Sequence, residues 1–167
     1  MTYEIKDETL REAASKCMDA FVDAISSAVK KGVGGDLSPQ TMPKLSSSQI
    51  TLLGYIALRN EVMDGGFIQL IYNGYGPFFF KNPFDTAIRR WGLIDLCRLM
   101  RHVKKSYLKH RETLECELSD DDFMALYEKF PEFDDFDDEF VSHEEVWTEQ
   151  VAHYLDEHLS DFVTIIE

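Results

Sequence analysis

Apolar residues recur every three or four positions along most of the chain, the spacing that lines one face of an α-helix. The pattern first appears between Leu10 and Val29, and a glycine-rich segment beginning at Gly32 ends it. We therefore expect an N-terminal helix over residues 3–31. Residues 32–45 have few large apolar groups, so they are predicted to form a loop.

Polar and glycine motifs delimit the next helical segments. Ser46 and Gln49 have the spacing of a capping box, which predicts a helix that continues to Gly65-Gly66. Residues 67–73 fit a short buried helix or a strand. The helical pattern on both sides favours a helix, closed by Asn73-Gly74 in a left-handed cap.

Residues 84–110 form the longest segment with helical periodicity. Two apolar stripes predict a helix buried on much of its circumference. The second half is basic, which suits the negative end of the helix dipole. The basic residues are Arg98, Arg101, Lys104, Lys105, Lys109 and Arg111.

The C-terminal third predicts two more helices around an acidic segment. Ser119 is a candidate N-cap for a helix that ends at Pro131. Residues 132–140 alternate acidic and aromatic side chains and are predicted to form a loop. Ser142–Glu145 resembles a second capping box that starts the last helix. Strands are scarce, so the predicted fold is an all-α, single-domain bundle over residues 1–167, with about six to eight helices around residues 84–110.

Length and composition agree with one soluble domain. The chain has 167 residues, 44% of them hydrophobic, which is enough for a core. No stretch approaches the roughly 20 apolar residues of a membrane span, and the first residues do not resemble a signal peptide. Its three cysteines (Cys17, Cys97, Cys116) are widely spaced, which argues for a reducing compartment. We therefore expect a cytoplasmic location and no membrane contact.

Acidic charge is concentrated in one part of the chain. The net charge is −14, yet residues 112–167 hold 20 acidic residues and only one base, Lys129, whereas residues 1–111 hold 11 acidic and 16 basic residues. This charge disfavours direct nucleic-acid binding, because phosphates would be repelled. It favours a basic protein as the partner.

Sequence motifs for catalysis or metal binding are weak. Asp134 and Glu145 have the spacing of the ends of an EF-hand loop, but Phe136 and Glu139 occupy its third and sixth positions, where an acid and a glycine are needed. No P-loop, nucleophile elbow or Cys-x-x-Cys motif is present. We expect no catalytic residue, no cofactor and no metal.

Residues 60–76 resemble the signature of the DNA mimic protein 19 family. The likeness extends over roughly residues 45–160, with Asp64 in place of the usual asparagine. The motif residues are Gly65, Gly66, Phe67, Gln69 and Asn73. The resemblance implies an all-α and often dimeric protein that occupies DNA-binding proteins with acidic patches. It implies no catalysis, and the motif itself reads as structural.

The leading hypothesis is an acidic interaction module that occupies the basic surface of a DNA-binding protein or transcriptional regulator. An immunity-type inhibitor of a basic toxin, a small-ligand or enzymatic pocket near Gln69, and acidity that serves only solubility are the alternatives. The side chains expected to contact a partner are Asp120, Asp121, Asp122, Asp134, Asp135, Asp137, Asp138, Glu139, Glu144 and Glu145.

Overall fold

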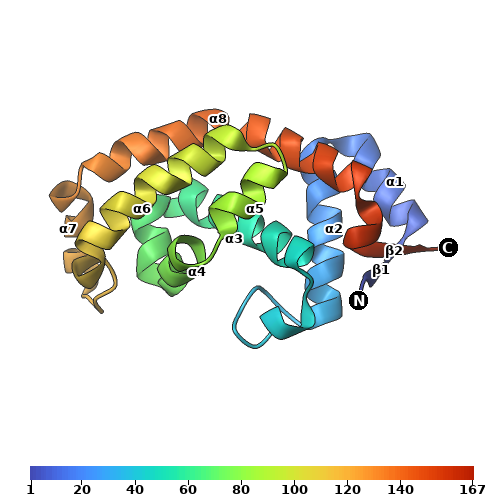
Figure 1. Ribbon diagram of the computed structural model, residues 1–167, viewed down its shortest axis with the longest axis horizontal. Coiled ribbons are helices and arrows are strands. Elements are labelled where there is room, and N and C mark those ends of the chain that lie inside the picture. The colour runs from blue at the N-terminus through green and yellow to red at the C-terminus, as the bar shows by residue number, and fades with distance from the viewer. The chain divides into compact units, whose positions relative to one another are not determined.

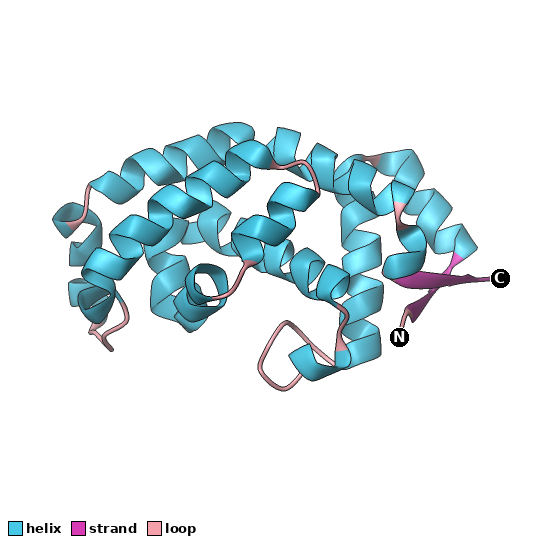
Figure 2. Cartoon of the chain, in the orientation of Figure 1, coloured by secondary structure: helices cyan, strands magenta, loops and turns pink.

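The computed structural model describes residues 1–167 and is helical over most of its length (Figure 2). The predicted all-α class is confirmed, with eight α-helices and one pair of short strands. The elements are β1 (Tyr3–Lys6), α1 (Asp7–Lys16), α2 (Met18–Val33), α3 (Ser47–Leu70), α4 (Gly76–Lys81), α5 (Phe84–Arg90), α6 (Ile94–Leu114), α7 (Asp120–Lys129), α8 (Glu132–Glu157) and β2 (Val163–Ile166).

The chain forms two compact units (Figure 1). The first contains residues 1–57 and 145–167, and the second contains residues 58–144. Helices α3 and α8 each contribute to both. The organisation of residues 1–167 as a single domain stays a prediction.

The first unit joins the two ends of the chain. Strand β1 pairs in parallel with β2, and Ile5 lies opposite Ile165. The capping box is confirmed, because the Gln49 side-chain oxygen accepts a hydrogen bond from the Ser46 N–H at 2.9 Å and the Ser46 hydroxyl accepts from the Gln49 N–H at 3.2 Å. The fully buried Gln49 amide also donates to the carbonyl of Phe162 at 3.0 Å.

The N-terminal helix predicted over residues 3–31 is wrong. Residues 3–6 are extended because they pair with β2, a partner that local periodicity does not reveal. The remainder divides at Cys17, whose backbone is extended at φ −171° and ψ 170°. Its sulfur caps α2 by accepting from the Ala20 N–H at 3.4 Å. Cys17 is therefore an exposed cap, whereas Cys97 is buried.

The second unit has an aromatic core between α4, α5 and α6. The Phe79 ring meets the edges of Phe78 and Phe84 at centroid distances of 4.8 and 4.9 Å. Phe80 packs on the fully buried Tyr107 at 4.9 Å. Aromatic pairs at these distances add to the stabilisation from burial, so this cluster fixes α6.

Two further predictions in the second unit need correction. The helix expected over residues 84–110 is divided into α5 and α6, because Gly92 has a φ of 92° that helices do not tolerate. Residues 132–140 are helical rather than a loop, and Ser142–Glu145 lies inside α8 instead of starting a helix. Fully buried Phe133 and Phe140, seven residues apart, explain this, since two helical turns place both on one face.

Candidate protein-interaction surface

Helix α7 presents three carboxylates in its first turn. The Ser119 hydroxyl caps the helix by accepting a hydrogen bond from the Asp122 N–H at 3.2 Å, as predicted. Asp120, Asp121 and Asp122 are all exposed. Their position is favourable for helix stability, because negative charge complements the N-terminal end of the helix dipole. They also leave three negative charges in solvent.

The first half of α8 carries a denser row of carboxylates. Its apolar face is buried through Phe133 and Phe140, which leaves Asp134, Asp135 and Asp138 exposed. These three exposed carboxylates lie within about 6 Å along the helix axis, at about 1.5 Å per residue. The mean interval between them is about 3 Å, close to the roughly 3.4 Å per charge of one strand of B-DNA.

We call the exposed carboxylates of α7 and the first half of α8 the acidic surface. It consists of Asp120, Asp121, Asp122, Asp134, Asp135 and Asp138. Glu139 and Glu144 are half-buried on the same part of α8. Glu145 is exposed and is the first residue of α8 that belongs to the first unit. Contact of these side chains with a partner stays a prediction.

Asp137 points inward, unlike the other predicted contact residues. Its carboxylate accepts a hydrogen bond from the Phe67 N–H at 2.8 Å. A Cβ atom on Gly66 would lie 2.1 Å from an Asp137 oxygen, and Gly66 has a φ of 77°. Asp137 therefore holds the glycine corner between the two segments of α3, and its role is structural.

Tyr127 holds the same corner from α7. Its hydroxyl donates a hydrogen bond to the Gly65 carbonyl at 2.7 Å. Sequence reasoning missed both contacts. The sequence pattern did indicate the inward position of Asp137, because this residue lies four residues after Phe133 and three before Phe140, on the apolar face of the helix. Tyr127 offered no comparable signal.

Burial changes the acidity of Asp137. Desolvation raises its pKa from 3.8 to about 7, against the opposing effect of the Phe67 N–H. Repulsion from the charges of Asp134 and Asp138 contributes to this rise of the pKa. Burial likewise raises the pKa of the Tyr127 hydroxyl, and the nearby Asp137 adds to this effect. One carboxyl group beside the acidic surface therefore titrates near neutral pH.

The remaining motif residues form a side-chain network around Glu61. The carboxylate of Glu61 accepts hydrogen bonds from the amides of Gln69 at 3.0 Å and Asn73 at 2.9 Å. The Gln69 amide also donates to Asp64 at 2.9 Å. These hydrogen bonds connect the residues before the glycine corner to the residues after it, which indicates a structural role for the motif.

The arginines Arg98 and Arg101 of α6 form ion pairs outside the acidic surface. Arg98 pairs with Asp95 at 3.2 Å and Arg101 pairs with Asp85 at 2.9 Å, both within residues 1–111. Between α6 and α8, His110 lies 3.0 Å from Glu132. The carboxylates of the acidic surface are therefore not held in ion pairs with these two arginines.

The EF-hand alternative does not fit the structure. Residues 134–145 lie within α8, so they cannot wrap around a calcium ion as a loop does. No group of three or more histidine, cysteine, aspartate or glutamate side chains is arranged to hold a metal ion. No helix is long and apolar enough to span a membrane.

Together, the fold and the surface define a class: a helical protein with a carboxylate-rich face supported by a structural glycine motif. The chain belongs to the DMP19-like protein family, whose model matches residues 43–158. Among curated proteins, it is 31% identical over 128 residues to the DNA mimic protein DMP19 of Neisseria meningitidis serogroup B. That alignment covers 75% of this chain and 77% of the relative. The predicted family membership is confirmed.

Proposed function

We propose that this protein is a DNA mimic that uses its acidic surface to occupy the DNA-binding site of a basic protein. The observation that carries the proposal is the axial interval of about 3 Å between the exposed carboxylates Asp134, Asp135 and Asp138 of α8, which approaches that of a DNA strand. A row of lysine and arginine side chains that normally contacts phosphates could therefore meet carboxylates at a similar density.

The similarity to a relative named as a DNA mimic supports the same role. Its name fits a binding protein rather than an enzyme. The partner class follows from charge, because an acidic surface selects a protein with a basic DNA-binding face. Binding through exposed ion pairs would weaken steeply with added salt.

The mechanism is competition for one surface. Helix α8 holds Asp134 and Asp138 one turn apart, while the first turn of α7 adds Asp120–Asp122 from the same unit. Because α8 is anchored by the buried Phe133 and Phe140 and α7 by the buried Leu126, the carboxylates are pre-positioned, which lowers the entropic cost of binding. The bound partner could not contact DNA at the same time.

The test uses proteins retained by this chain from a bacterial lysate at low salt, identified and then purified. We expect such a partner to be displaced by duplex DNA, and its affinity to fall as salt rises. The triple variant D134N/D135N/D138N should bind about tenfold or more weakly, at roughly 0.5 kcal/mol or more for each exposed pair lost.

A matched control removes three negative charges elsewhere. Glu4, Glu8 and Glu167 are exposed and lie outside the region matched by the family model. The variant E4Q/E8Q/E167Q should bind almost as tightly as the wild type. Equal losses for both triple variants, or a partner that binds DNA and this chain simultaneously, would show that the acidic surface does not act as a mimic.

A further inference from the structure

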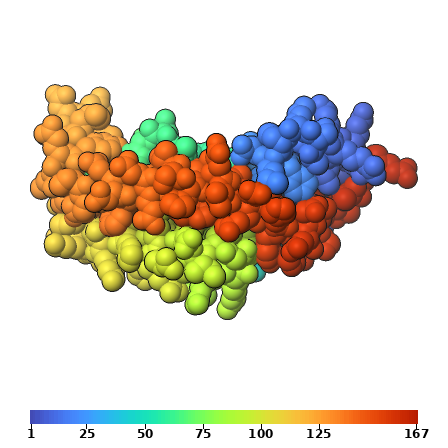
Figure 3. All heavy atoms as spheres, turned by 90° about the horizontal axis from the view of Figure 1, so that it is seen from above, coloured from blue at the N-terminus to red at the C-terminus, as the bar shows by residue number.

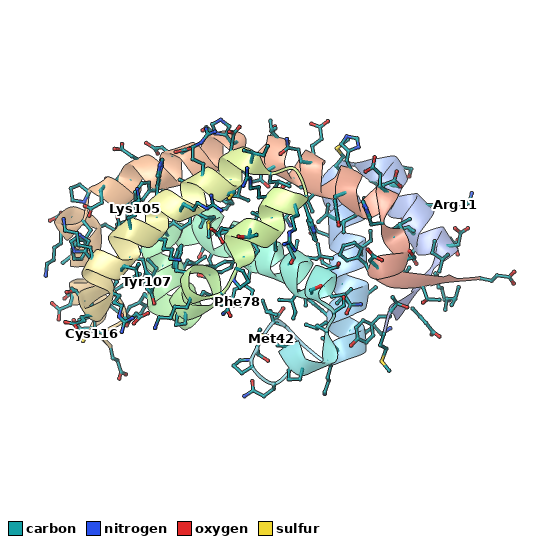
Figure 4. The ribbon with its side chains drawn as sticks, viewed as in Figure 1. Arg11, Met42, Phe78, Lys105, Tyr107 and Cys116 are labelled. Carbon is teal, nitrogen blue, oxygen red and sulfur yellow. The ribbon has the colours of Figure 1, made fainter.

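Helix α6 carries a row of three cations and one histidine on its exposed face, and the first of them, Arg98, also pairs with Asp95. Arg98, His102, Lys105 and Lys109 follow one another at intervals of four, three and four residues, which places them on one side of the helix over about 17 Å. All four are exposed. Figure 4 shows Lys105 on the side of α6 away from the buried Tyr107. We call these four residues the basic stripe.

The side of α6 about a quarter of a turn from the basic stripe offers an apolar contact. Leu108 is 51% exposed, and Lys104 and Arg111 flank it one turn away on either side. A hollow of about 310 Å³ is lined by residues 108–113. An exposed leucine among cations and beside a hollow suits a protein surface, which can bury it, better than a phosphate backbone.

The basic stripe and the acidic surface lie in the same unit, on neighbouring helices. The His110–Glu132 pair at 3.0 Å joins α6 to the first turn of α8, and the His110 ring packs on Phe130 at 4.5 Å. Figure 3 shows the two helices as adjacent bands, α6 in yellow and the first half of α8 in orange. The helix that carries the basic stripe therefore lies beside the helix that carries Asp134, Asp135 and Asp138.

We propose that the basic stripe binds an acidic patch that lies beside the DNA-binding face of the partner protein. This inference rests on the proposed function and specifies the partner that the acidic surface accepts. DNA presents negative charge alone, so a uniformly acidic mimic would bind many basic proteins. A row of cations next to the carboxylates repels a uniformly basic face and accepts one bordered by acidic groups.

A nucleic acid fits the basic stripe less well. The Debye length is about 8 Å at physiological salt, so phosphates placed on the stripe would also experience the charges of the neighbouring α8. A protein with adjacent basic and acidic rows would instead meet a complementary charge on each helix. The partner class is therefore a protein with a mixed-charge face.

Two synthetic helical peptides of about 20 residues, roughly 30 Å long, test this selection. One carries only a row of lysines, and the other carries the same row with a row of glutamates on the adjacent face. The variant K105E/K109E should bind the mixed-charge peptide about tenfold more weakly, since each reversal replaces an attraction with a repulsion. It should bind the lysine-only peptide at least as tightly as the wild type.

The matched control is K6E/K31E, which reverses two exposed lysines in the first unit. It should leave the affinity for the mixed-charge peptide almost unchanged, because that peptide has equal rows of opposite charge and only the net charge of the protein changes. The inference would be overturned if K105E/K109E changed the affinity for both peptides in the same direction and by the same factor. The inference would also be wrong if duplex DNA bound the wild type but not K105E/K109E. It would be wrong as well if sedimentation showed a dimer for the wild type and a monomer for K105E/K109E.

A different result would contradict the proposed function. If D134N/D135N/D138N binds the lysine-only peptide as tightly as the wild type does, the acidic surface is not a binding site. The peptide response of K105E/K109E can be read independently of that outcome. Circular dichroism checks that each variant keeps its helical content.

Discussion

The buried carboxyl of Asp137 should make stability depend on pH in a direction opposite to that of a typical aspartate. Its pKa is raised from 3.8 to about 7 in the folded protein, so the folded state binds a proton that the unfolded chain has released. The stabilisation is present below about pH 4 and is lost as pH rises through about 7. Replacement with asparagine removes the titration and keeps an oxygen that can accept from the Phe67 N–H.

The size of the effect follows from the linkage relation. At 1.36 kcal/mol per pKa unit, Asp137 would lose about 2 kcal/mol of stabilisation between pH 5.5 and 8.5. Because solvent reaches part of the side chain, we expect about 1 kcal/mol after screening. The free energy of unfolding of the wild type relative to D137N should therefore fall by this amount across the interval.

Urea denaturation followed by circular dichroism at several pH values measures this difference. The control is D135N, an exposed neighbour on the same helix, whose stability relative to the wild type should change little with pH. A wild-type minus D137N difference that does not change with pH would refute the raised pKa. A difference that grows with pH would show that the Phe67 N–H, rather than burial, controls the carboxyl.

Three further changes test the structural contacts by urea denaturation. Gly66→Ala should lower the free energy of unfolding by about 2 kcal/mol or more, because the position combines a positive φ with a steric clash. The control Gly34→Ala, at a positive φ with open space around it, should lower it by about 1 kcal/mol. Gln49→Ala should cost about 2–3 kcal/mol, since buried backbone groups lose their partner, and exposed Gln40→Ala should cost almost nothing. Tyr127→Phe should cost about 1 kcal/mol through one lost hydrogen bond, and no loss would show that the corner does not need it.

Local sequence chemistry predicted two helix caps of this fold and placed a third wrongly. The Ser46–Gln49 capping box and the Ser119 cap depend on residues within a few positions of each other. The Ser142–Glu145 box has the same spacing but lies inside α8, and the predicted glycine corner is also held by the distant Asp137 and Tyr127. The pairing of residues 3–6 with residues 163–166 depends on partners at the two ends of the chain, so periodicity near residue 3 could not reveal it.

The acidic surface was predicted by composition but not by geometry. Charge counts identified residues 112–167, and most of the proposed contact residues are exposed. Counting could not separate Asp137 from its neighbours, because its role depends on Gly66 and Phe67, about 70 positions earlier in the chain. A dense acidic run therefore has to be divided into structural and available carboxylates before it is compared with DNA.

The helical structure of residues 132–140 strengthens the case for mimicry. In the expected loop, carboxylates could move independently, and partner binding would have to pay for ordering them. In α8, Asp134 and Asp138 are held about 6 Å apart along the helix axis by the buried faces of Phe133 and Phe140. DNA is also a stiff array of charges. If rigidity matters, the conservative core change Phe140→Leu, which loosens the anchor and leaves every charge in place, should weaken partner binding without changing its salt dependence. Unchanged affinity at full helical content would show that charge density alone is sufficient.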